Sequence, residues 1–132
     1  MNKMLCLVLL AFLAMGICTA QVPNLVGKWT GFENGYAAEN GSYKLFENSS
    51  VSVVFEQKDR LLTGNVTYME NGKEMVDEFA GVIGSDNKTL YMTELTKGYV
   101  QATIISDDEI DLIYLVDGEI GAASFEKLRR IK

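Results

Sequence analysis

The 132-residue sequence has no histidine, one proline and two cysteines. Both cysteines, Cys6 and Cys18, lie in the first 20 residues, so residues 21–132 contain neither His nor Cys. That part of the chain cannot build a His-based triad, a thiol nucleophile or the usual zinc and haem ligation. It also has no disulfide, so packing and hydrogen bonds must stabilise it. We therefore expect a non-enzymatic domain without a metal ion or cofactor.

Basic residues are few, with 12 Lys and Arg against 18 Asp and Glu and a net charge of −6. The bases are scattered and form no patch, which argues against nucleic acids and anionic membrane surfaces as partners. The acidic group of Asp107, Asp108, Glu109 and Asp111 lacks the spacing and the glycine of a calcium-binding loop. We interpret it as solvated charge at a turn.

The first 20 residues are typical of a signal peptide. Lys3 supplies a positive start, residues 5–15 are almost continuously apolar, and small residues at Cys18 and Ala20 form a cleavage site. A membrane anchor is the alternative, but the apolar run is short for a span. A lipoprotein would need a small residue in place of Ile17. We predict cleavage after about Ala20, a secreted or envelope location, no stable membrane insertion, and one domain over residues 21–132.

Apolar residues alternate with polar ones through most of the domain, between short turn signals, which predicts β-strands. Asn71-Gly72 is the strongest hairpin signal. The expected strands cover residues 25–31, 50–57, 61–69, 73–84, 88–95, 98–106, 109–116 and 121–130. Eight strands joined in sequence order by short turns favour a closed antiparallel up-and-down barrel. A flat meander and a two-sheet sandwich are the alternatives.

Residues 33–48 interrupt this pattern with two turn-rich stretches and a short expected strand at 43–46. They predict a long loop, which is uncommon in a compact domain. Two interpretations stay open. The loop is either a lid or binding loop that carries Tyr36 and Tyr43, or an irregular surface excursion with an extra edge hairpin.

The only tryptophan, Trp29, lies between Gly27 and Gly31 at the spacing of a strand, so all three face one side. Glycine allows a close backbone approach, so we expect the sheet to curl tightly around the indole ring. This Gly-x-Trp opening resembles that of the calycin group, the lipocalins and avidins. Residues 61–67, Leu-Leu-Thr-Gly-Asn-Val-Thr, resemble the third-strand Thr-Gly-x-x-Thr segment of avidins.

The resemblance implies an eight-stranded ligand-binding barrel in which Arg129 or Arg130 closes over Trp29 by stacking and cation–π attraction. Several avidin features are missing. Gly31 and Phe32 replace a polar residue after the Trp, and Val66 and Tyr68 replace the third-strand Tyr and Thr. With one tryptophan, and without the lipocalin Thr-Asp-Tyr signature, biotin binding is not expected and a separate family of exported barrels is indicated.

Aromatic side chains supply the candidate ligand site. The candidates are Trp29, Tyr68, Tyr91, Tyr99 and Tyr114 as walls, Glu94 and Gln101 as polar anchors, and Tyr36 and Tyr43 in the lid. They predict a small apolar or aromatic ligand in a cavity of about 300 Å³ or more, with core packing as the alternative role for the rings.

Asp77 and Glu94 lie in strands beside apolar residues. Either they are buried charges that need partners, or they stay solvated near a strand end, which we favour.

A protein-interaction module is the alternative function. Exported eight-stranded barrels that resemble this one include bacterial protease inhibitors, which implies a filled core and a partner site in residues 21–24 or 33–48. Val54, Val76 and Val82 are expected on the outer face, where they could support a homodimer. Asn-x-Ser/Thr sequons, whose glycosylation depends on the host, begin at Asn40, Asn48, Asn65 and Asn87.

Overall fold

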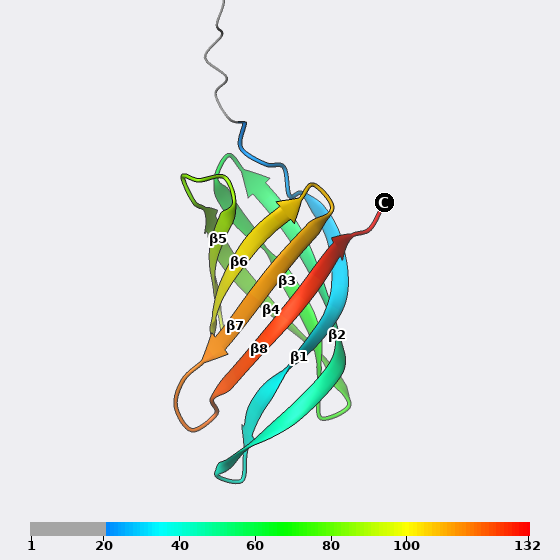
Figure 1. Cartoon of the computed structure of the whole chain (residues 1–132), viewed down its shortest axis with the longest axis vertical. Coiled ribbons are helices and arrows are strands. Elements are labelled where there is room, and N and C mark those ends of the chain that lie inside the picture. The colour runs from blue at the N-terminus through cyan, green and yellow to red at the C-terminus, as the bar shows by residue number, and fades with distance from the viewer. Residues whose placement is uncertain (1–20) are drawn as a thin grey trace, which may run out of the picture.

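The computed structural model describes residues 21–132, and the predicted signal peptide lies outside the described residues. The strands are β1 (Gly27–Glu39), β2 (Ser42–Lys58), β3 (Leu61–Glu70), β4 (Lys73–Ile83), β5 (Thr89–Glu94), β6 (Tyr99–Ser106), β7 (Glu109–Val116) and β8 (Ala122–Arg130). Each pairs antiparallel with the next, and β8 pairs with β1, which closes the barrel (Figure 1). The predicted all-β up-and-down barrel is confirmed. Within residues 21–132 no helix is long and apolar enough to cross a membrane.

The loop predicted over residues 33–48 is wrong. β1 and β2 stay paired through this region as far as Glu39 and Ser42, and they form a hairpin that projects beyond the barrel body (Figure 1). The chain turns only at Asn40-Gly41, where both residues have positive φ, 52° and 78°. Asn71-Gly72 has nearly the same values, 51° and 75°, and both pairs match a type I′ turn.

The second Asn-Gly pair of this region, Asn34-Gly35, does not turn the chain. It lies where the register between β1 and β2 shifts, at a β-bulge. The amide of Asn48 donates to Oδ1 of Asn34 over 2.8 Å, and Asn48 itself has a positive φ of 56°. An asparagine side chain thus holds the bulge where the sequence indicated a turn.

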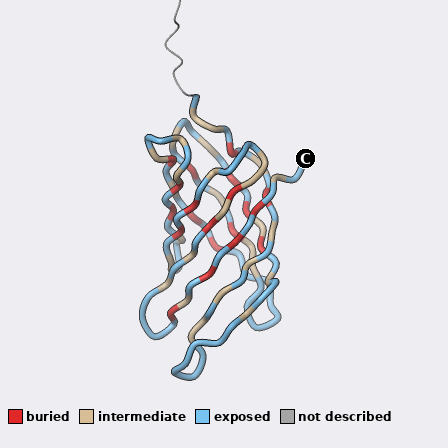
Figure 2. Tube along the Cα trace, in the orientation of Figure 1, coloured by how far each residue is buried: buried red, intermediate tan, exposed pale blue. Residues whose placement is uncertain are grey.

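The barrel interior is packed with apolar side chains from every strand. Figure 2 shows buried positions alternating with exposed ones along the strands. The buried apolar residues are Leu25, Trp29, Val51, Val53, Phe55, Leu62, Val66, Phe79, Ile83, Leu90, Met92, Val100, Ala102, Ile110, Leu112 and Leu128. Three rings meet edge to face, with centroids 6.2 Å apart for Trp29 and Phe55 and 5.3 Å apart for Phe55 and Phe79.

The outer face carries the three valines expected there, since Val54, Val76 and Val82 are all exposed. Of the four sequon asparagines, Asn87 is half-buried and the other three are exposed. The three valines thus lie where the sequence predicted, and glycosylation and dimerisation stay predictions.

The acidic turn between β6 and β7 is balanced by bases at the end of the chain. Asp108 lies 3.0 Å from the Lys132 ammonium and 3.6 Å from Nε of Arg130, and Glu109 lies 3.0 Å from Arg129. In the described part of the chain no group of three or more His, Cys, Asp or Glu side chains is arranged to hold a metal ion.

Candidate functional site

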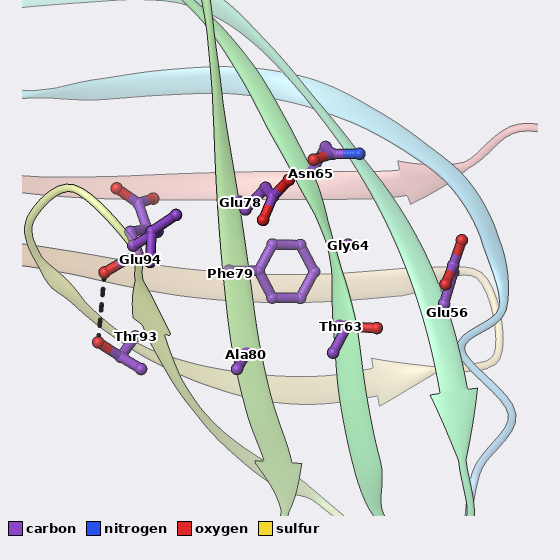
Figure 3. A pocket seen from close by; sticks show the side chains of 10 residues that line it. Glu56, Thr63, Gly64, Asn65, Glu78, Phe79, Ala80, Thr93 and Glu94 are labelled. Atoms are coloured by element: carbon purple, nitrogen blue, oxygen red, sulfur yellow. Dashed lines mark hydrogen bonds between the residues drawn. The ribbon is translucent and has the colours of Figure 1, made fainter.

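A hollow of about 670 Å³ lies on the outer face of the barrel, over β2 to β5 (Figure 3). Two of its lining residues, Gly64 and Ala80, have no side chain or only a methyl group. Its rim residues Glu56, Thr63 and Glu78 are exposed. These rim groups are solvated. Glu94, the half-buried acid of this lining, also lines a second hollow at one end of the barrel, and we place the candidate site there.

Trp29 lies at one end of the barrel, where the chain enters β1, and its side chain has no solvent exposure. Its indole Nε1 donates to the carbonyl oxygen of Leu25 over 2.9 Å. The neighbouring glycines allow this packing. A Cβ on Gly31 would lie 1.8 Å from the carbonyl oxygen of Lys127, and Gly27 has a positive φ of 124°. β1 and β8 can therefore approach closely around the ring.

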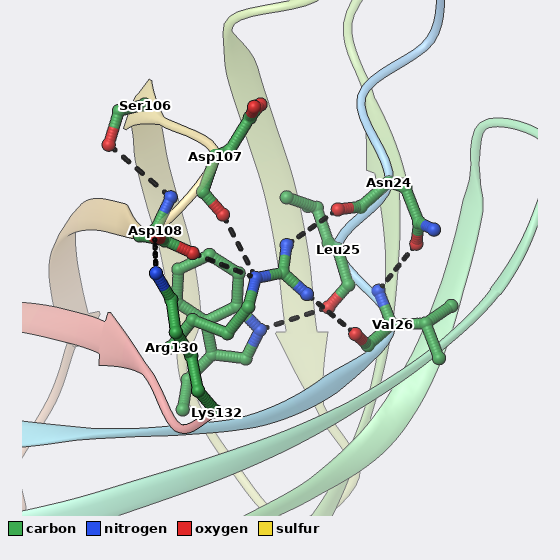
Figure 4. Close-up of polar contacts among 9 residues, drawn as sticks. Asn24, Leu25, Val26, Ser106, Asp107, Asp108, Arg130 and Lys132 are labelled. Carbon is green, nitrogen blue, oxygen red and sulfur yellow. Dashed lines mark hydrogen bonds and ion pairs between the residues drawn. The ribbon is translucent and has the colours of Figure 1, made fainter.

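Of the two arginines proposed to cover Trp29, it is Arg130 that does so, with its guanidinium carbon 4.4 Å from the ring centroid. Arg129 points outward, with its side chain 75% exposed. The Arg130 guanidinium donates to the carbonyl oxygens of Asn24 (2.6 Å), Val26 (2.7 Å) and Asp107 (2.9 Å) (Figure 4). It thereby ties the entry segment to the end of β8.

Gln57 holds the same entry segment from the other side. Its Oε1 accepts from the Leu25 amide over 2.8 Å, and its Nε2 donates to the Pro23 carbonyl over 2.9 Å. Residues 21–26 thus close this end, which we call the closed end. Trp29 is fully enclosed there and does not reach any ligand cavity.

The opposite end of the barrel, which we call the mouth, holds a cavity of about 410 Å³. Its lining comes from the projecting β1–β2 hairpin, the β3–β4 hairpin and the loops that follow β5 and β7: Glu33, Ala37, Ala38, Phe46, Ser49, Tyr68, Met69, Glu70, Asn71, Lys97, Tyr114, Val116, Ile120 and Ala122. Below it, a hollow of about 40 Å³ is lined by Glu33, Val51, Val66, Tyr68, Glu94, Tyr114 and Glu126. We call this hollow the floor. The interior beyond it is nearly filled, with a remaining void of about 20 Å³.

Three carboxylates converge on the floor from different strands. Glu33 of β1 and Glu126 of β8 are directly opposite each other in the ladder, and Glu94 comes from the end of β5. Opposed like charges destabilise a strand pair. Glu126 is 7% exposed, and among the described residues it has no hydrogen bond and no ion pair. The floor therefore holds a buried acid without a polar partner.

Burial raises the pKa of all three acids. The pKa of Glu126 rises to about 8, first from burial and then from the charges of Glu33 and Glu94. Burial and the charge of Asp77 raise the pKa of Glu94 to about 7, and the Tyr114 hydroxyl opposes that rise. The pKa of Glu33 is also raised by burial, which the Ser124 hydroxyl partly offsets. Near neutral pH the floor therefore holds protons that ordinary carboxylates would have lost.

Asp77 corrects the expectation that strand-end acids stay solvated. It is 6% exposed, and its Oδ1 accepts hydrogen bonds from the Thr96 hydroxyl and the Glu78 amide, each over 2.9 Å. Glu94 is half-buried in the floor. Both acids are inside the barrel, and Asp77 has the partners that a buried charge requires.

The structure brings together three of the predicted ligand residues, since Tyr68, Glu94 and Tyr114 all line the floor. Burial raises the pKa of both tyrosines, so their hydroxyls remain protonated donors. The Tyr114 hydroxyl also lies 3.4 Å from the Lys97 carbonyl oxygen. The mouth thus offers two tyrosine side chains beside the carboxylates.

Other predicted ligand residues lie elsewhere. Tyr91, Tyr99 and Gln101 are exposed on the outer face, because the residues on either side of them point inward: Leu90, Met92, Val100 and Ala102. The prediction of Tyr91 and Tyr99 as cavity walls and of Gln101 as a polar anchor is therefore wrong. Tyr36 and Tyr43 are 52% and 63% exposed on the projecting hairpin and do not line the cavity.

Sequence reasoning missed Glu33 and Glu126. Glu33 was assigned to a loop, so no facing was predicted for it. Glu126 shares its alternation with the buried Ser124 and Leu128, a signal that could have placed it inside. The neighbouring Phe125 obscured that signal, because it is a large apolar residue that faces outward.

No family model matches the chain, and no curated protein matches it in sequence. Among solved structures, the chain is similar to a redesigned β-barrel, mFAP0, bound to DFHBI, with a TM-score of 0.56, 17% identity, and coverage of 80% of this chain and 98% of that one. It is also similar to the S-type phycobiliprotein lyase CPES from Guillardia theta, with a TM-score of 0.53, 10% identity, and coverage of 82% and 89%. At these identities the likeness shows the fold, an eight-stranded antiparallel barrel.

Proposed function

We propose that this protein is an exported, non-enzymatic barrel that binds a small ligand with an apolar or aromatic body in the mouth. The observation that carries the proposal is the mouth cavity of about 410 Å³, whose walls include the apolar residues Phe46, Val116 and Ile120 and whose floor presents Tyr68 and Tyr114. Ligand pockets in proteins commonly have volumes of about 300–1,000 Å³ and a few convergent polar groups. The similar barrel mFAP0, which is bound to DFHBI, supports the proposal at the level of the fold.

Two further parts of the proposal rest mainly on sequence. The Gly27-Lys28-Trp29 opening, together with Arg130 over the indole ring, supports a place in the calycin group. The composition of residues 1–20 supports export. The intact mass of the protein from its own source tests export, since a chain that begins at about Gln21 is expected and a chain that retains residues 1–20 would contradict it.

Binding of N-phenyl-1-naphthylamine, an uncharged apolar fluorophore at neutral pH, tests ligand binding in the mouth. We expect its fluorescence to rise with the wild-type protein, and we expect Ala122→Trp to abolish that rise because Ala122 lines the cavity. Ala123→Trp is the matched control, because the next residue is exposed on the outer face. Equal binding by both variants would show that the fluorophore occupies another site and would overturn the proposal.

Native mass spectrometry of protein purified from its source complements this test. A non-covalent mass above the mass of the chain is expected, and the Ala122→Trp variant expressed in the same host should lack it. An extra mass that survives the substitution would place the bound molecule outside the mouth.

A protein-interaction module is the second candidate, and the projecting hairpin favours it. Tyr36, Tyr43 and Leu45 on this hairpin are all more than half exposed. Removing two facing pairs, residues 38–39 and 42–43, keeps the Asn40-Gly41 turn and shortens the hairpin in register. If the hairpin binds a protein, a partner that co-purifies with the full chain is lost on shortening while the barrel stays folded. Retention of the partner would contradict this candidate.

A further inference from the structure

We infer that the ligand of the mouth is a small organic cation, an apolar or aromatic amine whose ammonium group lies among Glu33, Glu94 and Glu126. The inference rests on the proposed function, because it names the chemical class of the ligand in the same cavity. Its body would lie against the apolar walls of the mouth, and its charged end would enter the floor.

The first support is the position of the acids in the fold. Glu33 and Glu126 are paired residues of adjacent strands with both side chains in the floor, and Glu94 joins them there from β5. A cation between these carboxylates replaces repulsion with attraction, since opposite charges within about 4–6 Å favour the ionised form of an acid. An uncharged ligand would offer no opposite charge, so only the protons that the acids hold near neutral pH would relieve the repulsion.

The second support is independent of the first, and it is the unpartnered state of Glu126. As a residue Glu126 is 7% exposed, and its side chain lines the floor, yet no donor from the described residues bonds to it. A buried carboxylate ordinarily has hydrogen-bond partners or an opposite charge. An ammonium group carries three donors and a positive charge, so it supplies both.

The third support is the lack of a protein cation that could serve instead. The titratable groups that face the floor and its rim are Glu33 from β1, Tyr68 and Glu70 from β3, Asp77 from β4, Glu94 from β5, Lys97 from the following loop, Tyr114 from β7 and Glu126 from β8. Lys97 is the base among them, and it lies at the rim 4.0 Å from Glu70, from where its charge lowers the pKa of Glu94. Among the described residues no base forms an ion pair with Glu33 or Glu126, which leaves these two acids to a ligand.

The size and chemistry of the floor favour an amine over a metal ion. Its volume of about 40 Å³ admits a group the size of one water molecule, which takes up about 30 Å³ in the liquid. No acidic group within residues 21–132 has the arrangement of a metal site. Tyr68 and Tyr114 flank the same hollow, and the faces of aromatic rings attract ammonium groups.

The test compares three probes of one shape and different charge: 2-phenylethylamine, 2-phenylethanol and 3-phenylpropanoate. Isothermal titration calorimetry at pH 8.5 should show the amine binding at least tenfold more tightly than the alcohol, with no binding of the carboxylate. Because binding displaces a proton from an acid whose pKa is about 8, amine affinity should fall by about tenfold or more between pH 8.5 and pH 6.5.

Glu126→Gln should weaken amine binding at least tenfold, flatten its pH dependence and leave alcohol binding unchanged. Glu78→Gln removes the same charge from the exposed outer face and should match the wild type. Equal affinity for amine and alcohol, or unchanged amine binding in Glu126→Gln, would overturn the inference. The apolar fluorophore separates the two claims. If it binds in the mouth and the amine has no advantage, only the inference fails, and if neither binds, the proposed function fails as well.

Discussion

The two ends of this barrel use the same strands for opposite purposes. On β1, Trp29 is buried beside other aromatic rings at the closed end. Glu33 follows on the same side of the strand and lies in the acidic floor of the mouth. On β8, Leu128 is fully buried and Glu126 is a buried acid without a partner. The alternation of inward and outward residues is continuous between the ends. Packing is thus concentrated at the closed end, and buried acids without an opposite charge are concentrated at the mouth, where we propose that a ligand binds.

The largest contrast is expected between two aromatic substitutions. Trp29→Ala should lower the free energy of unfolding by about 3–5 kcal/mol, because a fully buried ring is lost from a packed region. Tyr68→Ala at the mouth should cost less than about 2 kcal/mol, because this ring is half-buried beside a cavity. Urea denaturation measures both. Equal costs would show that the mouth contributes as much to stability as the closed end does.

Neutralising an acid of the mouth is expected to raise the free energy of unfolding, whereas the two aromatic substitutions lower it. The pKa of Glu126 rises from 4.5 to about 8 on folding, so the folded state holds a proton that the unfolded chain loses between these values. The free energy of unfolding therefore falls as pH rises from about 4.5 to about 8. Glu126→Gln does not titrate, and it should stabilise the protein by about 2–4 kcal/mol at pH 8.5 and by little at pH 4.5. Thermal unfolding across this range measures the effect, and a destabilised variant at pH 8.5 would contradict it.

The smallest effect concerns the cover of the closed end. Arg130→Lys keeps the charge but loses the planar fork that donates to three carbonyl groups over the indole ring. We expect a cost of about 1–2 kcal/mol, as for one or two partly buried hydrogen bonds and a weakened cation–π contact. Arg129→Lys is the control and should change stability by less than about 0.5 kcal/mol, because Arg129 is 75% exposed. Urea denaturation measures both variants, and equal losses of stability would contradict a structural role for Arg130.

Alternation and turn chemistry made the fold predictable. Alternation of apolar and polar residues predicted the strands that form β3 to β8, and Leu62 and Leu112 are among the residues of these strands that point inward. The single failure of the fold prediction came from Asn34-Gly35, which resembles a hairpin turn in sequence. Its role in a bulge depends on a hydrogen bond to Asn48, a residue 14 positions away. Local sequence carries no record of that contact.

The site was predictable only in part, for a related reason. Tyr68, Glu94 and Tyr114 were found because their strands have an unambiguous inward face. Tyr91 was assigned to the cavity from its residue type, although the alternation that places Glu94 beside Leu90 and Met92 puts Tyr91 outside. The convergence of Glu33 with Glu126 required closure of the barrel, because these residues become neighbours only when β8 pairs with β1.

The hydrogen bonds of Arg130 have a practical consequence for handling the protein. They join the end of β8 to the carbonyl groups of Asn24 and Val26, so residues 21–26 and 130–132 lie side by side at the closed end (Figure 4). A tag or tether added at Lys132 is therefore remote from the mouth. Protein immobilised through that residue on a sensor surface would leave the mouth open to the flowing solution.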